Sequence, residues 1–199
     1  MVIIGAGAIG IEFAYFYAAL GTKVTVIEML PRILPIEDPE SSTFLARYLK
    51  KIGIDIHVST PVESVSVNGE RVNVRAKGSD GLKEFSGDVC LVAIGFGANT
   101  QGWGFETTGV ALDRGFIKVD EYYGTNVPGY YAIGDVIGPP QLAHVASHAG
   151  IICVEKIAGQ NPHPLDYSNV PSCTYCQPQV ASVGLNEQYC RDNNIPVKI

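Results

Sequence analysis

The sequence predicts an α/β fold in which a parallel sheet carries an antiparallel β-meander as an insertion. Residues 1–58 alternate short apolar runs with helical patterns in the order β-α-β-α-β, which is the signature of a parallel sheet. Residues 61–89 instead alternate polar and apolar side chains with a period of two, and Asn68-Gly69 and Asp80-Gly81 mark turns between about three strands.

The first 58 residues supply the elements of the expected sheet. Strands are predicted at Val2–Ile4, at residues 23–28 and at residues 54–58, and the first helix at residues 8–20. The second helix is expected to start with Asp38 as N-cap and Pro39 in its first position, and to end at Gly53. Its apolar stripe is expected to comprise Phe44, Leu45, Tyr48 and Leu49.

The remainder of the chain predicts a return to the sheet and then shorter elements. The apolar residues 89–95 are expected to rejoin the buried parallel sheet. A short strand at 116–120, a buried strand at 131–133 and a helix at 142–157 follow, and residues 161–171 have the composition of a linker. Residues 172–184 are strand-like, a short helix is capped by Asn186, and residues 196–199 are expected to begin a strand.

Composition narrows the classes of partner. The 199 residues are 46% hydrophobic and 17% charged, which suffices for a sizeable core. The net charge is −6 without a sustained basic face, so neither nucleic acid nor an anionic membrane is an expected partner. No apolar run reaches the ~18 residues of a membrane span, and the opening lacks the basic flank of a signal peptide. Five scattered cysteines fit a cytoplasmic protein better than a disulfide framework.

Three glycines near the start, Gly5, Gly7 and Gly10, have the G-x-G-x-x-G spacing of a Rossmann-like dinucleotide site. An apolar strand precedes them and a helix follows. In such a loop the first glycine permits a tight turn, the second lets a pyrophosphate approach the backbone, and the third lets the helix pack close to the sheet. The helix N-terminus then offers free N–H groups to the phosphates. The alternative is a glycine-rich turn without a ligand.

Glu28 ends the second predicted strand, 18 residues after Gly10. A carboxylate at this place accepts hydrogen bonds from the ribose hydroxyls of NAD and would repel the 2′-phosphate of NADP. The sequence therefore favours NAD over NADP. The alternative is a solvated glutamate at a strand end.

A second candidate site follows the apolar residues 131–133, which end in Gly134-Asp135. Ligands of parallel sheets bind at the carboxyl ends of the strands. Asp135 is therefore expected to be either a ligand-binding acid or a helix N-cap, and its sequence context leaves both open.

The order of the motifs "VIIGAGAIGIEFA", "VTVIEMLPRILP", "VAIGFGANT", "TNVPGYYAIGDVIGPPQLAH" and "VPSCTYCQPQVASVG" resembles the two-dinucleotide flavoprotein disulfide reductases, and among them the dihydrolipoamide dehydrogenases. The resemblance covers essentially the whole chain and implies an oxidoreductase that uses NAD and FAD. It implies contacts to NAD by Gly5, Ala6, Gly7, Ala8, Ile9, Gly10, Glu12, Glu28, Val62 and Gly95, with Glu12 near the nicotinamide. It implies contacts to FAD by Asp135, Gln141, Leu142, Ala143 and His144.

The same resemblance implies a domain organisation. The family inserts its NAD domain into an FAD domain, and a dimerisation domain with the catalytic His and Glu follows. We therefore expect an NAD-binding domain at residues 1–118, a second segment of the FAD-binding domain at 119–164 and the truncated start of an α+β dimerisation domain at 165–199. The chain is expected to be a central fragment without catalytic residues of its own, from an enzyme that is homodimeric and part of a 2-oxoacid dehydrogenase complex.

Two short motifs resemble functional sites and are interpreted otherwise. Cys173 and Cys176 have the spacing of a zinc or redox pair, but no second pair exists, and an extended segment would turn the two thiols to opposite faces. No metal site is therefore expected. His163 lies in the linker and is expected on the surface, while His57 and His148 are expected to be packed or solvated.

Three alternatives to a dihydrolipoamide dehydrogenase stay open at this point. Within the same family they are a soluble pyridine nucleotide transhydrogenase and a mercuric reductase. In a different class, the chain would be a free-standing nucleotide-binding or sensor module. The sequence departs from the family at Phe96-Gly97-Ala98, where a basic residue followed by proline is usual.

Overall fold

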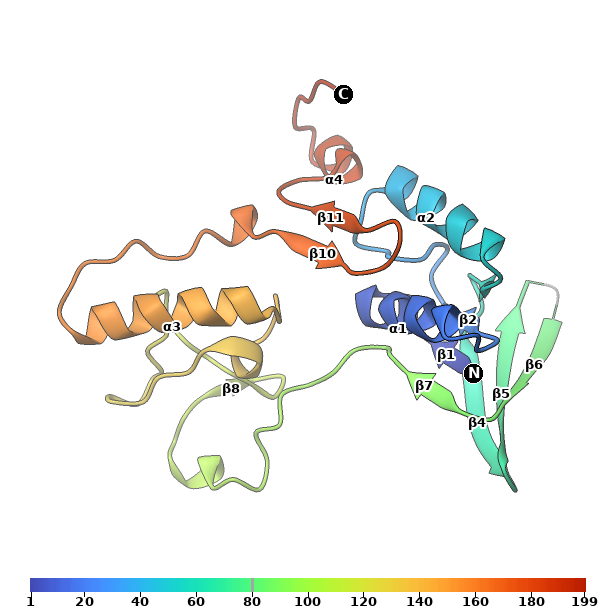
Figure 1. Cartoon of the computed structure of the whole chain (residues 1–199). Coiled ribbons are helices and arrows are strands. Elements are labelled where there is room, and N and C mark those ends of the chain that lie inside the picture. Colours follow the sequence, from blue (N-terminus) through green and yellow to red (C-terminus); the bar gives the residue numbers. More distant parts are fainter. Residues whose placement is uncertain (80) are drawn as a thin grey trace. The chain divides into compact units, whose positions relative to one another are not determined.

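The computed structural model describes residues 1–79 and 81–199, so that the predicted turn residue Asp80 lies outside the described residues (Figure 1). They form two compact units. The first combines residues 1–94 with 171–199, and the second contains residues 95–170. Among the described residues, no helix is both long enough and apolar enough to cross a membrane.

The first unit is built on the predicted parallel sheet. Its order is β3 (Asp55–His57), β2 (Thr25–Ile27), β1 (Val2–Ile4) and β7 (Cys90–Val92). All three neighbouring pairs are parallel. The carboxyl ends of these strands therefore share one edge of the sheet, which is where ligands bind in folds of this kind.

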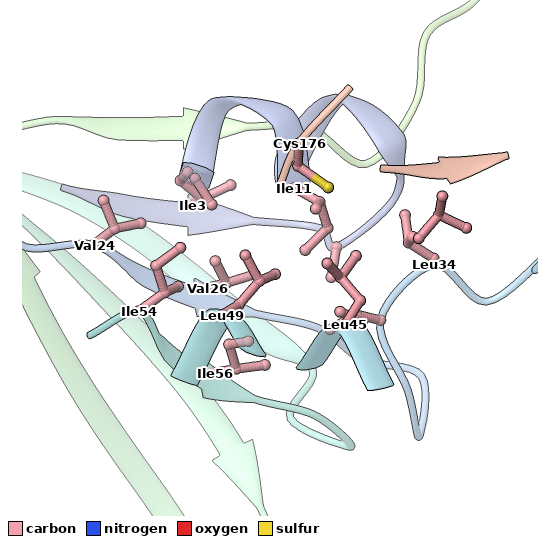
Figure 2. Close-up of a cluster of buried hydrophobic side chains, with 14 residues drawn as sticks. Ile3, Ile11, Val24, Val26, Leu34, Leu45, Leu49, Ile54, Ile56 and Cys176 are labelled. Atoms are coloured by element: carbon pink, nitrogen blue, oxygen red, sulfur yellow. The ribbon is translucent and has the colours of Figure 1, made fainter. Parts of the chain in front are cut away.

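Two helices cover one face of this sheet. In α1 (Ala8–Ala19) Ile11 and Ala14 are buried, and in α2 (Pro39–Lys51) Leu45 and Leu49 are buried. Figure 2 shows these leucines and Ile11 in one cluster with strand residues such as Ile3. The Asp38 carboxylate caps α2 as predicted, by accepting from Glu40 N at 2.9 Å. Phe44 was wrongly placed in the apolar stripe: it is 64% exposed, because it lies on the outer face of α2 beside the buried Leu45.

The predicted meander is confirmed. It consists of β4 (Val62–Asn68), β5 (Arg71–Gly78) and β6 (Gly81–Gly87), paired antiparallel in that order. Val74 and Ala76 of β5 are fully buried and pack with β1 and β2 side chains. The meander therefore covers parallel-sheet residues that do not contribute to the helix-side core.

Strand β7 rejoins the parallel sheet as predicted, but the expectation that residues 89–95 are buried is wrong. Val92 is 57% exposed and Ile94 is 74% exposed. The reason is that β7 is the last strand in the sheet order and pairs only with β1 among the described strands.

Residues 171–199 contribute a hairpin and a short helix to the first unit. Strands β10 (Ser172–Thr174) and β11 (Val180–Ser182) pair antiparallel, so the residues 172–184, predicted to be strand-like, form a two-stranded hairpin. The α4 helix (Glu187–Asp192) begins at Asn186, whose side chain accepts from Tyr189 N at 2.7 Å as predicted. The prediction of a strand at 196–199 is wrong, because these residues pair with no strand in the described part of the chain.

The second unit contains mostly loops and one long helix. A two-residue ladder joins β8 (Leu112–Asp113) to β9 (Phe116–Ile117). The long helix is α3 (Ala143–Ile157), and the 3₁₀ turns are η1 (Phe105–Thr107), η2 (Gly134–Ile137) and η3 (Tyr167–Asn169). Tyr123 packs with Ala149, Ile152 and Cys153 as the core of this unit.

The expected buried strand at 131–133 is wrong. Tyr131 makes only an isolated antiparallel bridge with Gly124, and its side chain is 47% exposed. The apolar run therefore lacks a neighbouring strand within the described part of this unit. The domain boundaries at 118/119 and 164/165 stay predictions, because the two compact units describe packing within this chain alone.

Candidate dinucleotide site

The glycine loop follows β1 and leads directly into α1. Gly5 has a φ of +100°, and a β-carbon on it would overlap the carbonyl oxygen of Ala93, just after β7. A β-carbon on Gly10 would overlap the carbonyl oxygen of Gly5. Both positions therefore need glycine for the backbone's own packing, which agrees with the turn and close-packing roles predicted for them.

Gly7 is different, because the protein itself does not need glycine there. Its φ is −71°, and a β-carbon on it would have no atom within 4 Å. The space beside Gly7 is open. A glycine in open space fits a loop whose backbone a ligand approaches, and the residues present therefore fit a dinucleotide pyrophosphate.

The N-terminus of α1 also fits an anion. No side chain caps it and its first turn carries no acid. The first intrahelical bond runs from Ile11 N to Gly7 O at 3.0 Å, so the preceding N–H groups of Ala8, Ile9 and Gly10 have no helical acceptor. Ala8 and Ile9 are exposed. Free N–H groups and the positive end of the helix dipole can together hold a phosphate.

Glu28 lies one residue beyond β2 and is only 6% exposed. Its Oε2 accepts a hydrogen bond from Ala6 N at 2.7 Å, and its Oε1 accepts one from Leu30 N at 2.8 Å. The alternative of a solvated glutamate at a strand end is therefore wrong. A carboxylate can accept about four hydrogen bonds, so Glu28 keeps acceptor capacity for a ligand while it ties the glycine loop to the loop after β2.

The loop after β2 forms a support that the sequence analysis missed. Leu34 N donates to Ala6 O at 2.7 Å, and Leu34 adopts a φ of +43°. Arg32 donates through Nη2 to Pro35 O at 2.9 Å, while its buried Nε has no partner in the described part of the chain. Pro31 and Pro35 are typical of a loop, but no local pattern in the sequence indicates that this loop folds back onto Ala6.

Glu12 makes a long-range contact that was also missed. Its Oε1 accepts from Tyr175 N at 2.7 Å, across 163 positions of sequence. Val62 begins β4 and is partly buried. Gly95, with a φ of +122°, is the first residue of the second unit. The structure thus brings the glycine loop, Glu12 and Glu28 together in the first unit, and the NAD contacts of all these residues stay predictions.

The residues predicted to contact FAD all lie in the second unit. Asp135 is exposed within η2, and Gln141 Nε2 donates to its backbone oxygen at 3.4 Å. Leu142 is the N-cap of α3, and its side chain makes no capping hydrogen bond. Ala143 and His144 lie in the first turn of that helix and are exposed. The expectation that Asp135 ends a parallel strand is wrong, and so is the N-cap alternative, because Asp135 lies inside η2.

Cys173 and Cys176 do not lie in one continuous extended segment, as the sequence analysis assumed. Cys173 belongs to β10, whereas Cys176 lies in the turn beyond it, 4% exposed, with Sγ donating to Pro178 O at 3.2 Å. Burial raises the pKa of the Cys176 thiol to about 11, and the nearby Glu12 adds to this. All five cysteines are free. Among the side chains that the structure describes, no three from His, Cys, Asp or Glu are grouped to hold a metal.

The histidines occupy ordinary environments. His57 Nε2 lies 2.8 Å from the Asp55 carboxylate, and its ring packs against Phe85 with 4.8 Å between centroids. His148 and His163 are exposed, on α3 and in the linker respectively. His57 is thus packed and the other two are solvated, as expected.

Comparisons with known proteins agree with this geometry. A family described as pyridine nucleotide-disulphide oxidoreductase matches residues 1–150. The dihydrolipoyl dehydrogenase of Rhizobium etli is 45% identical over 201 residues, which cover 100% of this chain and 42% of that protein. The corresponding enzyme of Zymomonas mobilis is 47% identical over 203 residues, covering 100% and 43%. The chain therefore spans less than half the length of these relatives.

Solved structures give the same fold. LpdA from Mycobacterium tuberculosis matches with a TM-score of 0.86 and 30% identity, over 96% of this chain and 41% of that one. The HOCl-induced flavoprotein disulfide reductase RclA from Escherichia coli matches with a TM-score of 0.87 and 30% identity, over 96% and 43%. The predicted fold class is thereby confirmed.

Proposed function

This chain belongs to the pyridine nucleotide-disulphide oxidoreductase family, and from that premise we propose that it is the NAD-binding core of an FAD-dependent dihydrolipoamide dehydrogenase. The proposed enzyme oxidises dihydrolipoamide to lipoamide with NAD as the acceptor. The observation that carries the proposal is identity of 45% and 47%, along the entire chain, to proteins named dihydrolipoyl dehydrogenase. A mercuric reductase or a soluble transhydrogenase would share the fold, so the assignment depends on this identity.

The glycine loop and α1 are proposed to hold the pyrophosphate of NAD. The open space at Gly7 and the uncapped helix end supply both room and N–H donors. Glu28 would accept the ribose hydroxyls with the lone pairs that Ala6 and Leu30 leave unused. Its negative charge, held in a buried position, would disfavour the 2′-phosphate of NADP.

The second unit is proposed to supply part of the FAD site. The described residues offer the Asp135 carboxylate no hydrogen bond, so it would be available to the ribityl hydroxyls. The uncapped start of α3, with residues 141–144, would lie against the flavin ring or its phosphates. FAD and NAD supply the redox chemistry when bound, and the residues of this chain bind and orient them.

The wider organisation is proposed on the same basis. The NAD-binding domain would comprise residues 1–118, the FAD-binding domain would include residues 119–164, and the dimerisation domain would begin with residues 165–199. The enzyme would be a homodimer within a 2-oxoacid dehydrogenase complex. Its location would be cytoplasmic. The support for a reducing compartment is that the five cysteines, an odd number, are scattered along the sequence and do not form the pattern of a disulfide framework.

The test is the substrate specificity of the whole enzyme that contains this chain. Reduction of NAD by dihydrolipoamide is the expected activity, measured as the rate of NADH formation. Mercuric ion reduction or NADPH-to-NAD transhydrogenation, with no turnover of dihydrolipoamide, would contradict the proposal and select one of the two alternatives within the family.

A further inference from the structure

Asn68 and Gly69 form the Asn-Gly pair that the sequence marks as a turn of the meander. Asn68 is the last residue of β4 and pairs with Arg71 at the start of β5. Gly69 begins the turn between these strands, with a φ of +60°. Figure 1 shows this connection at the tip of the β4–β5 hairpin. The ladder of strand pairs therefore supports Asn68 from one side only.

The turn is open to water, and hydrogen bonds do not hold its reactive groups. Asn68, Gly69 and Glu70 are exposed. A β-carbon built on Gly69 would meet no atom within 4 Å. Neither the Asn68 carboxamide nor the Gly69 N–H has a hydrogen-bond partner in the described part of the chain. The exposed end of a hairpin also opens at a low cost in free energy, because few buried contacts hold it.

The Asn-Gly pair places an electrophilic carbon and a nucleophilic nitrogen in adjacent residues. The backbone nitrogen of Gly69, once deprotonated, can attack Cγ of Asn68 and form an N–Cγ bond. The Cγ–Nδ2 bond then breaks, and the NH₂ group leaves as ammonia after taking up the proton that Gly69 N lost. Water hydrolyses the cyclic succinimide to aspartate or isoaspartate. Glycine favours this ring closure, because it has no side chain beside the nitrogen and its backbone is conformationally permissive.

We propose that Asn68 is a site of spontaneous deamidation in the folded chain, with water as the co-reactant. Asn73 in the same meander provides an internal comparison. It precedes Val74, whose branched side chain hinders the next backbone nitrogen, and it pairs with Ser66 on one side and Ser86 on the other. The competing explanation is that the folded turn holds Asn68 away from Gly69 N. The inference is independent of the proposed function, because no dinucleotide takes part in the reaction.

Deamidation changes the charge and the pairing at the tip and leaves the base of the meander intact. An aspartate at position 68 lies across the ladder from Arg71, whose guanidinium is 2.9 Å from the Asp88 carboxylate. An isoaspartate adds a methylene to the backbone and disrupts the pair with Arg71. Val74 and Ala76, which pack with β1 and β2 side chains, lie further along β5.

Peptide mapping by mass spectrometry tests the proposal on the purified chain, kept folded in mildly alkaline buffer. Product at Asn68 is expected before product at Asn73 or at any other asparagine, as two isomeric peptides that contain aspartate and isoaspartate. Gly69→Ala should form the product at least about tenfold more slowly, which corresponds to a barrier about 1.4 kcal/mol higher. The strain of alanine at a positive φ loosens the turn and therefore acts in the opposite direction.

A parallel incubation in urea separates the effect of the turn from that of the dipeptide. The denatured chain keeps the Asn-Gly pair and should form the product. Product in urea with none in the folded chain over the same time would overturn the inference, because the folded turn then protects Asn68. Equal rates for the folded unmodified chain and for Gly69→Ala would overturn it as well. Asn68→Asp reproduces one product and should unfold at the same urea concentration as the unmodified chain.

Discussion

The carboxylate of Glu28 lies 2.7 Å from the amide nitrogen of Ala6, inside the glycine loop. The acid that is expected to select the cofactor is therefore also a structural part of the loop that holds it. Its second oxygen accepts from Leu30 N, so one buried side chain joins two separate loops. Substitution of Glu28 must affect the loop as well as any ligand.

Glu28→Ala should lower both stability and cofactor selectivity. The buried Ala6 N–H loses its acceptor, and an unsatisfied buried donor costs about 1–3 kcal/mol, while the partly buried Leu30 N–H loses its acceptor as well. Urea unfolding should show a loss in that range or above it, and the difference between NADH and NADPH affinity should narrow because repulsion of the 2′-phosphate is removed. The matched variant Glu28→Gln keeps one acceptor and should lose less stability. Unchanged unfolding of Glu28→Ala would contradict the structural role.

Two glycine-to-alanine variants in the same loop should behave differently. In Gly10→Ala the new methyl overlaps the Gly5 carbonyl oxygen, so we expect a loss of roughly 1–3 kcal/mol or more in unfolding free energy. In Gly7→Ala the methyl enters open space, so stability should be near that of the unmodified chain while NADH binding falls. Denaturant unfolding with calorimetry measures both. Equal stability of the two variants would show that the helix does not approach the loop this closely.

The buried thiol of Cys176 gives a prediction for alkaline pH. Its pKa is raised by burial from 9.0 to about 11, so between these values the unfolded chain loses a proton that the folded chain keeps. The Cys176 contribution to stability is therefore complete below about pH 9 and is lost as the pH rises toward 11. Cys176→Ala should lose less stability than the unmodified chain across this interval, as measured by urea unfolding at a series of pH values. Parallel pH profiles for both proteins would contradict a buried, protonated thiol.

The burial of Cys176 also predicts that its thiol reacts slowly with alkylating reagents. Near neutral pH the half-exposed Cys173 should react with a thiol alkylating reagent before Cys176 does. Mass spectrometry of partially modified protein identifies the order.

Elemental analysis of protein purified without chelator should find less than one zinc per chain, because Cys173 and Cys176 are not expected to bind a metal. One equivalent of zinc would contradict this interpretation of the two cysteines.

The periodicity of apolar residues predicted the parallel sheet and the meander, and residue type predicted the two helix caps, Asp38 and Asn186. These features could be predicted because each is determined by residues that are close together in the sequence. Periodicity failed at residues 131–133 and 196–199, because an apolar run becomes a strand only where another strand is available to pair with it. The glycine spacing indicated the loop, yet the contacts of Glu12 with Tyr175 and of Leu34 with Ala6 depend on tertiary packing. No pattern within a short window contains that information.

The flavin residues lead to a prediction about cofactor retention. In the described part of the chain the candidate contacts are Asp135 and residues 141–144, and Asp135 is exposed. Contacts of this number and exposure should not hold FAD through purification. The purified 199-residue chain should be colourless and should not reduce NAD with dihydrolipoamide, as absorption spectroscopy and the NADH assay would show. A yellow and active preparation would contradict this placement of the flavin and catalytic groups.

The glycine loop, α1 and Glu28 are proposed to form an NAD site, and parallel calorimetric titrations with NADH and NADPH test this most directly. We expect the chain to bind one NADH and to bind NADPH at least about tenfold more weakly, because the buried Glu28 carboxylate repels the 2′-phosphate. Equal or tighter binding of NADPH, or no binding of NADH, would contradict it.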